Sequence, residues 1–260
     1  MFGVIIVGAG PCGLLLAVLL SKQGVQVQVL EASTELDDQP RACHYSAPAK
    51  FELERAGVLD SISAEGFFPR SVCWRKNHGS HIVGLNHEIE PESSVHRMVA
   101  LELGRVVQIL YNAATEQEGT EVLMGHRVTA VGQDDLSAWV EVALPSGQSD
   151  HGGLGLTGGI ADVGALYDAL AGIHKGVADE QILTEYSEAR SAKYRGYVDP
   201  LSTANFRRLW EKDPETTVAG DGFFQMVREA QADPDVAKKM LEVRSSHDSF
   251  AYWSKWADLV

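Results

Sequence analysis

The sequence of 260 residues predicts an α/β fold built on a parallel sheet. Two observations favour this fold class. Residues 4–7 form a short apolar run, which is typical of a buried strand, and this run leads through a glycine-rich turn into an apolar helix that starts near residue 11. A second strand is predicted at residues 26–30, and a strand–helix–strand order is typical of parallel strands joined by a crossover helix.

The turn after the first strand has the G-x-G-x-x-G spacing of a dinucleotide-binding loop, formed by Gly8, Gly10 and Gly13. In such a loop the first glycine permits the tight turn, the second lets the backbone approach a pyrophosphate, and the third lets the helix pack on the sheet. Pro11 suits the first helical position, where no N–H is needed, and Cys12 follows it inside the loop. The helix N-terminus would then point its N–H groups at the phosphates.

An acidic residue follows at the expected distance. Glu31 ends the second strand about 20 residues after the glycines, where a carboxylate meets a ribose hydroxyl in dinucleotide-binding proteins. A glycine turn in an ordinary α/β unit remains the alternative, but this context favours the dinucleotide site.

Composition restricts the function classes. A net charge of −14 without a basic block argues against nucleic-acid binding and disfavours anionic membranes. The three cysteines, Cys12, Cys43 and Cys73, have no metal-ligand spacing and fit a reducing compartment. The histidines between residues 78 and 96 lack the spacing of a zinc site, so no metal is expected. The first apolar run is too interrupted for a signal peptide or a membrane span, and we expect a cytoplasmic protein.

Further elements follow in order. Helices are predicted at 47–56, ended by Gly57, and at 103–115; strands are predicted at 121–124, 127–131 and 139–144, and residues 70–98 read as short strands and loops. Residues 179–205 are predicted to be mostly helical with a break before Pro200, and two amphipathic helices follow at 223–232 and 236–243. Arg41 lies in a loop that could return to the phosphates, although composition alone favours a solvated loop arginine.

A second glycine-rich loop, residues 152–159, leads into a predicted helix at 160–170. A glycine loop at a helix N-terminus suits an anion or an oxygen with developing negative charge. A flexible linker is the alternative, and the helix that follows directly favours the binding site.

Taken together, these segments resemble the class A flavoprotein monooxygenases, the FAD-dependent aromatic hydroxylases of the p-hydroxybenzoate hydroxylase type, and most of all the fungal phenol hydroxylase-like enzymes. The likeness is carried by VIIVGAGPCGLLLA with Glu31, by QPRACHYSAPAKFELERAGVLD, and by GGLGLTGGIADVGALYDAL. The resemblance implies a Rossmann-like FAD-binding fold of the glutathione-reductase type, with small antiparallel strands and C-terminal helices. It also implies FAD as cofactor, NADPH or NADH as reductant, and a small aromatic substrate with O2.

The resemblance also assigns roles to single residues. It places Gly8, Gly10 and Gly13, with Pro11 and Cys12, along the FAD pyrophosphate and Glu31 at the adenosine ribose. Arg41 resembles an arginine near the ribose and pyrophosphate, and Arg105 or Gln108 resembles a polar contact from the following helix. In the second loop, the backbone of Gly155, Leu156 and Thr157 would face the flavin pyrimidine, and Asp150 resembles the remnant of a ribitol-binding aspartate.

The sequence departs from this family in its middle. The Gly-Ala-Asp-Gly and Gly-Asp-Ala-Ala-His segments of the family are absent, and residues 144–152 leave no room for a substrate-covering sheet. We therefore expect a family member that lacks its middle segment. The expected organisation is an FAD-binding domain at 1–178, made of parts 1–148 and 149–178, with a C-terminal helical extension at 179–260 packed on the same domain.

Three functions are compatible with these observations. The first is an FAD-dependent monooxygenase acting on a phenolic or aromatic polyketide-type substrate, in which no side chain of the protein need act as a nucleophile. The second is a non-catalytic FAD-binding remnant. The third is a nicotinamide-dependent Rossmann dehydrogenase, against which the sequence has no Tyr-x-x-x-Lys pair and leaves the second glycine loop unexplained.

Overall fold

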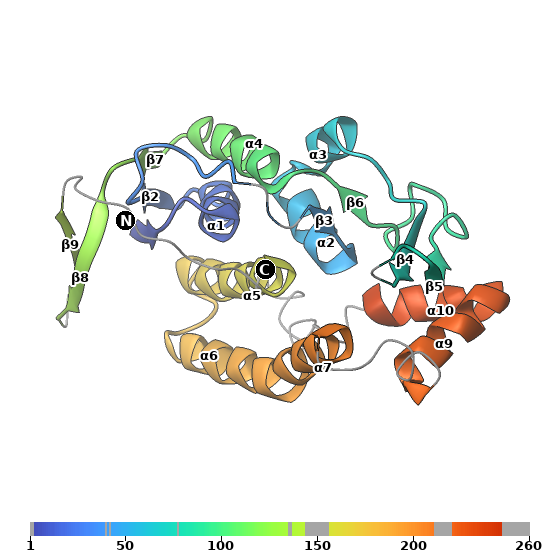
Figure 1. The fold of residues 1–260 in the computed structure, drawn as a ribbon. Coiled ribbons are helices and arrows are strands. Elements are labelled where there is room, and N and C mark those ends of the chain that lie inside the picture. Colours follow the sequence, from blue (N-terminus) through green and yellow to red (C-terminus); the bar gives the residue numbers. More distant parts are fainter. Residues whose placement is uncertain are drawn as a thin grey trace.

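A parallel sheet of three strands, in the order β1 (Gly3–Val7), β2 (Gln26–Leu30) and β7 (Thr120–Leu123), lies at one end of the computed structural model (Figure 1). The structure describes residues 3–39, 41, 43–76, 78–134, 137–143, 156–210 and 220–245. Val4 pairs with Val27, and Val29 pairs with Val122. The α/β class and the parallel sheet are confirmed. In this sheet β2 is central, because β1 and β7 pair with its two edges and no described strand flanks β1 on its other side.

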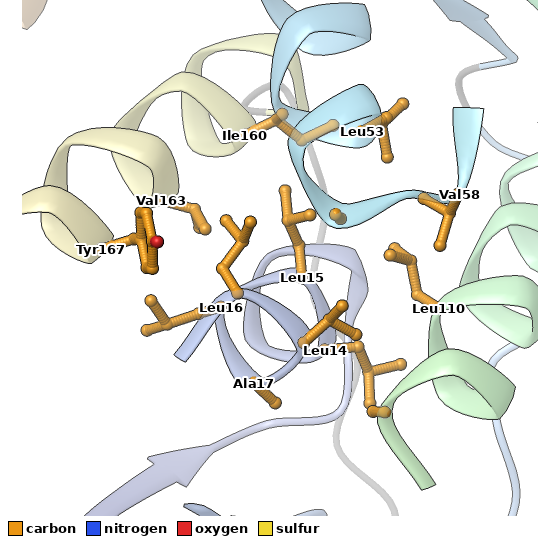
Figure 2. Packing of buried hydrophobic residues seen from close by; sticks show 14 of the residues in the cluster. Leu14, Leu15, Leu16, Ala17, Leu53, Val58, Leu110, Ile160, Val163 and Tyr167 are labelled. Carbon is orange, nitrogen blue, oxygen red and sulfur yellow. The ribbon is translucent and has the colours of Figure 1, made fainter. Parts of the chain in front are cut away.

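The first helix, α1 (Pro11–Ser21), is the centre of the main hydrophobic core. Every residue from Leu14 to Ser21 is buried, so this helix is apolar on all sides rather than amphipathic. Figure 2 shows Leu14, Leu15 and Leu16 pointing toward the surrounding helices. Full burial of one such leucine contributes roughly 1.5–3 kcal/mol, so this helix holds the adjoining glycine loop in place.

Three helices pack around α1, and they come from distant parts of the chain. They are α2 (Ala47–Ala56), α4 (Leu103–Thr115) and α5 (Leu156–His174). From α5, Ile160, Val163 and Tyr167 enter the core (Figure 2). The helix predicted at residues 160–170 is therefore present and packs on the core, and α5 extends four residues further at each end.

Short antiparallel pairs complete the first half of the chain, as predicted for a fold with small antiparallel strands. Within the described ranges each of these sheets has two strands, so no extended substrate-covering sheet is found there. The pairs are β3 (His44–Tyr45) with β6 (Val99–Ala100), β4 (Ser71–Arg75) with β5 (His81–Asn86), and β8 (Arg127–Gln133) with β9 (Ala138–Ala143). One further helix, α3 (Leu59–Glu65), was not predicted.

The C-terminal helices pack on the hairpin formed by β4 and β5. Here α9 (Gly222–Ala232) and α10 (Pro234–Ser245) bury a second, smaller core against Val83 and Leu85 of β5 (Figure 1). Asp221 caps α9, because its Oδ1 accepts a hydrogen bond of 2.9 Å from the N–H of Phe223. Both helices lie within one or two residues of their predicted bounds.

The predicted break before Pro200 is wrong, because the chain remains helical there. It runs from α6 (Gln181–Lys193) through a π-helical turn, η1 (Tyr194–Val198), into α7 (Asp199–Trp210). Pro200 directly follows the π-helical turn, and this wider turn accommodates the proline within a helix that continues on both sides. An ion pair between Arg190 and Asp162 joins α6 to α5.

The domain boundaries at residues 148 and 178 stay predictions. None of the helices in the described ranges has the length and apolar character needed to span a membrane. No cluster of three or more histidine, cysteine or acidic side chains suited to a metal occurs in the same ranges.

Candidate nucleotide-binding site

A pocket of about 550 Å³ opens at the carboxyl ends of β1 and β2. In open α/β sheets this edge is where ligands bind, and the volume lies within the range of small-molecule sites. Three segments distant in sequence form its walls: residues 7–11, residues 30–39 with Arg41, and residues 126–128, with Leu103 and Val107 of α4 closing one side.

The first wall is the predicted glycine loop, and its three glycines have the expected geometry. Gly8 has φ = +104°, a backbone conformation that strains any other residue. A Cβ on Gly13 would lie 2.1 Å from the carbonyl oxygen of Gly8, so only glycine allows α1 to approach the strand this closely. Around Gly10, by contrast, a Cβ would meet no atom within 4 Å, which leaves open space for a ligand.

The loop delivers a helix N-terminus to the pocket. Gly10 is the N-cap of α1, Pro11 occupies the first helical position as predicted, and the first helical hydrogen bond runs from the N–H of Leu14 to the carbonyl of Gly10 at 3.0 Å. The N–H groups ahead of Leu14 have no acceptor inside the helix. Together with the helix dipole, they favour an anion at this position.

Glu31 connects the second wall to the first. Its Oε2 accepts a hydrogen bond of 2.7 Å from the N–H of Ala9, and its Oε1 accepts one of 2.8 Å from the N–H of Ser33. The carboxylate at the end of the second strand therefore reaches the glycine loop. Each carboxylate oxygen retains a free lone pair, so contact with a ribose hydroxyl is compatible with these bonds and stays a prediction.

The third wall, residues 126–128, was not predicted as part of the site. Hydrogen bonds from the N–H of Gly125 to Ser33 O (2.7 Å) and from the N–H of His126 to Glu31 O (2.6 Å) hold it against the second wall. Gly125, with φ = +72°, turns the chain between β7 and β8. That glycine was the available sequence signal, but a turn alone does not show which earlier segment it will meet.

Of the other polar residues predicted for the site, one lines the pocket and two lie outside it. Arg41 lines the pocket, where its exposed side chain pairs with Asp37 at 2.5 Å. Arg105 pairs instead with Glu65 at 2.8 Å, and neither it nor Gln108, which bonds Asn112, lines the pocket. The roles assigned to Arg105 and Gln108 by resemblance thus gain no geometric support.

The start of α5 lies beside the start of α1. A Cβ on Gly159 would lie 2.8 Å from the Sγ of Cys12, so Cys12 faces α5 rather than the pocket. Burial, helped by the nearby carboxylate of Asp162, raises the pKa of the Cys12 thiol to about 11, which makes it an inert packing group. Leu156 packs against the main core. Asp150, Gly155 and the side chain of Thr157 lie outside what the structure describes.

Comparison with known proteins identifies the family. Residues 1–150 match the FAD binding domain family, and this chain belongs to it. It is 32% identical over 148 residues to para-nitrophenol 4-monooxygenase of Pseudomonas sp. strain WBC-3, across 56% of this chain and 37% of that protein. It is 45% identical over 80 residues to 6-hydroxy-3-succinoylpyridine 3-monooxygenase HspB of Pseudomonas putida strain DSM 28022 / S16, across 31% of this chain and 20% of that protein.

The chain thus spans well under half the length of these two relatives. A solved structure of p-nitrophenol 4-monooxygenase PnpA from Pseudomonas putida DLL-E4 superimposes with a TM-score of 0.79 and 19% identity, covering 94% of this chain and 98% of that one. At this identity the likeness shows the fold. It confirms the expected FAD-binding fold of flavoprotein hydroxylases.

The walls of the pocket fit the adenosine diphosphate half of FAD. The open space at Gly10, the free N–H groups of α1 and the carboxylate of Glu31 form a row that matches pyrophosphate followed by ribose. Backbone N–H groups and a helix dipole supply positive potential there, so a protein with a net charge of −14 can hold an anionic cofactor.

Proposed function

We propose that this chain is the FAD-binding part of a monooxygenase that hydroxylates a phenolic or other aromatic ring with NADPH or NADH and O2. The pocket at the carboxyl edge of the parallel sheet carries this proposal, because its glycine loop, helix N-terminus and acidic strand end suit a dinucleotide. The names of the relatives, a nitrophenol and a hydroxypyridine monooxygenase, support the substrate class. Membership of the FAD binding domain family favours flavin over the nicotinamide dehydrogenase alternative.

In this proposal the bound FAD supplies the redox chemistry with reductant and O2. The residues of this chain bind and orient it. The backbone of residues 8–13 holds the pyrophosphate, Glu31 holds the ribose, and Arg41 adds a positive charge at the pocket rim. The N-terminus of α5, with the backbone of Leu156 and Thr157, supplies a positive dipole end toward the flavin.

We also propose the domain organisation that the sequence suggested, with residues 1–178 forming the FAD-binding domain and residues 179–260 an extension packed on it. The contacts of α6 with α5, and of α9 and α10 with β5, support this arrangement. A protein that consumes NADPH or NADH and keeps three unpaired cysteines suits the cytoplasm.

A non-catalytic FAD-binding remnant is the second candidate. It is favoured by one observation, namely that the antiparallel sheets in the described ranges have two strands each, which leaves the flavin without a broad cover there.

Two measurements test the proposal and separate the candidates. The purified chain should bind FAD, seen as a saturable change in flavin fluorescence when FAD is titrated with the protein. NADPH or NADH oxidation that rises on addition of a phenol or hydroxypyridine, with formation of a hydroxylated product, supports the monooxygenase. FAD binding without this response identifies the remnant, and absence of FAD binding contradicts both.

A further inference from the structure

His126 is held in the wall of the pocket by two hydrogen bonds of its own. Its backbone N–H donates to Glu31 O at 2.6 Å, and its Nδ1 lies 2.8 Å from the carbonyl oxygen of Met124. The half-buried imidazole lines the pocket. Because both the backbone and the ring are fixed, the side chain is pre-organised before any ligand arrives.

The bond to Met124 decides which ring nitrogen carries the proton. A carbonyl oxygen only accepts hydrogen bonds, so Nδ1 must be the N–H donor. In the neutral imidazole, Nε2 then carries a lone pair and acts as an acceptor. Among the described residues no side chain or backbone group bonds to this Nε2.

The position of His126 along the pocket indicates which part of a nucleotide it meets. The phosphate position is at Gly10 and Pro11, and the carboxylate of Glu31 follows, bonded to Ala9. His126 comes next, bonded to the backbone carbonyl of Glu31. Phosphate, ribose and base follow one another in the same order in an adenosine nucleotide, so the base lies against the wall that contains His126.

We propose that Nε2 of His126 accepts a hydrogen bond from the exocyclic amino group of adenine and thereby makes this pocket selective for adenine. The inference rests on the proposed function, since adenine is the base of FAD. Hypoxanthine has a carbonyl oxygen in place of that amino group, and two acceptors facing each other repel. A site built around one hydrogen bond rejects an analogue that lacks it more strongly than an apolar site does.

The experiment compares ADP with inosine diphosphate, using calorimetric titration of the full chain. The wild-type protein is expected to bind ADP about tenfold more tightly. His126→Asn keeps a donor near the Nδ1 position, and hence the bond to Met124, but has no acceptor at the Nε2 position. It should bring the two affinities to within about twofold. His126→Gln places an amide oxygen near Nε2 and should restore part of the preference.

His78→Asn is the matched control, because His78 is exposed and does not line the pocket, and it should keep the wild-type ratio. The proposal is overturned if His126→Asn keeps the wild-type ratio, or if both nucleotides weaken equally, since the latter marks a purely structural role. FAD binding by the same proteins, measured by flavin fluorescence, distinguishes a failure of the proposed function from a failure of the proposed role of His126. Loss of FAD binding in the wild type contradicts the proposed function as well, whereas normal FAD binding with an unchanged base preference contradicts only the role of His126.

Discussion

Glu31 shows how one side chain can serve both the fold and the site, since its carboxylate bonds the glycine loop and borders the pocket. Glu31→Ala leaves the N–H of Ala9 without its acceptor and removes the proposed ribose partner. We expect FAD binding to weaken by about 1–3 kcal/mol, measured as Kd by flavin fluorescence. Glu121→Ala is the control, because Glu121 bonds the side chain of Gln28 outside the pocket and should leave Kd unchanged. An unchanged Kd in Glu31→Ala would contradict the assignment.

Gly13 fixes the distance between α1 and the end of β1. Gly13→Ala forces a Cβ against the backbone oxygen of Gly8, so the helix must move, and we expect the free energy of unfolding to fall by about 3 kcal/mol. Chemical denaturation followed by circular dichroism measures this. Gly158→Ala in α5 is the matched control, since a Cβ there meets no atom within 4 Å. Equal effects of the two substitutions would show that steric contact at Gly13 is not the cause.

At single residues, the sequence was informative where function depends on local backbone geometry. The glycine spacing predicts Gly8, Gly10 and Gly13 because a turn into a helix is encoded within a few neighbouring residues. The positions of Arg105 and His126, by contrast, are set by partners far away in the sequence. Arg105 turns to Glu65, forty residues earlier, and His126 meets Glu31 across the sheet. Neither pairing follows from spacing along the chain.

Among the elements, the contact between α2 and α5 carries a buried acid. Glu52 packs against Gly164 of α5 and pairs with Arg55 at 2.9 Å, while Arg55 also pairs with Asp168 of α5 at 2.5 Å. Burial raises the pKa of Glu52 to about 7, with Asp168 contributing, although Arg55 opposes the shift. A raised pKa means that the folded protein holds this proton more tightly than the unfolded chain does. The resulting stabilisation is complete below about pH 4.5 and is lost as the pH rises through about 7.

Glu52→Gln should abolish this pH dependence, because the amide mimics the protonated acid. Relative to wild type, we expect its free energy of unfolding to improve by about 3 kcal/mol between about pH 4.5 and about pH 8. Urea denaturation at several pH values measures this difference. Glu54→Gln, on the exposed side of the same helix, is the control and should show a much smaller change. A parallel pH profile for Glu52→Gln and wild type would contradict the raised pKa.

The boundaries of helices and strands were predictable where a single residue preference decides them. They were less predictable at glycines and prolines, which are found both inside helices and at their ends. The helix after the second glycine loop was expected from Ile160, but α5 begins at Leu156, because Gly158 and Gly159 are helical and Gly159 packs against Cys12. Pro200 was expected to break a helix, yet the helix continues through it, because a π-helical turn precedes the proline. Gly57, at the end of α2, has the left-handed φ that a C-cap glycine provides, as expected.

For the whole molecule, the arrangement of distant parts was the least predictable feature. The amphipathic patterns of α9 and α10 predict helices with one buried face, but not the surface that buries it. That surface is the β4–β5 hairpin, where Trp74 packs edge-to-face against Phe223 with ring centroids 5.2 Å apart. Which surface covers α9 and α10 depends on contacts between side chains some 150 residues apart, and no pattern in a single sequence predicts such contacts.

The proposed hydroxylation depends on how well the flavin is shielded from water. Oxygen-activating flavin sites release peroxide without hydroxylating when water reaches them, so hydroxylation requires a cover over the flavin. In the described ranges the antiparallel sheets have two strands each, and α9 and α10 are packed on β5 rather than over the nucleotide pocket. We therefore expect this chain to bind FAD weakly and to oxidise NADPH or NADH with more peroxide than hydroxylated product.

The measurement is stoichiometric: reductant consumed, peroxide formed and product formed are compared across a panel of phenols and hydroxypyridines. Catalase, which removes peroxide without affecting a coupled reaction, is the control for the assay. Product equal to the reductant consumed, with little peroxide, would contradict the prediction. It would show that the flavin is covered after all, by a surface other than the two-stranded sheets and helices whose packing is described.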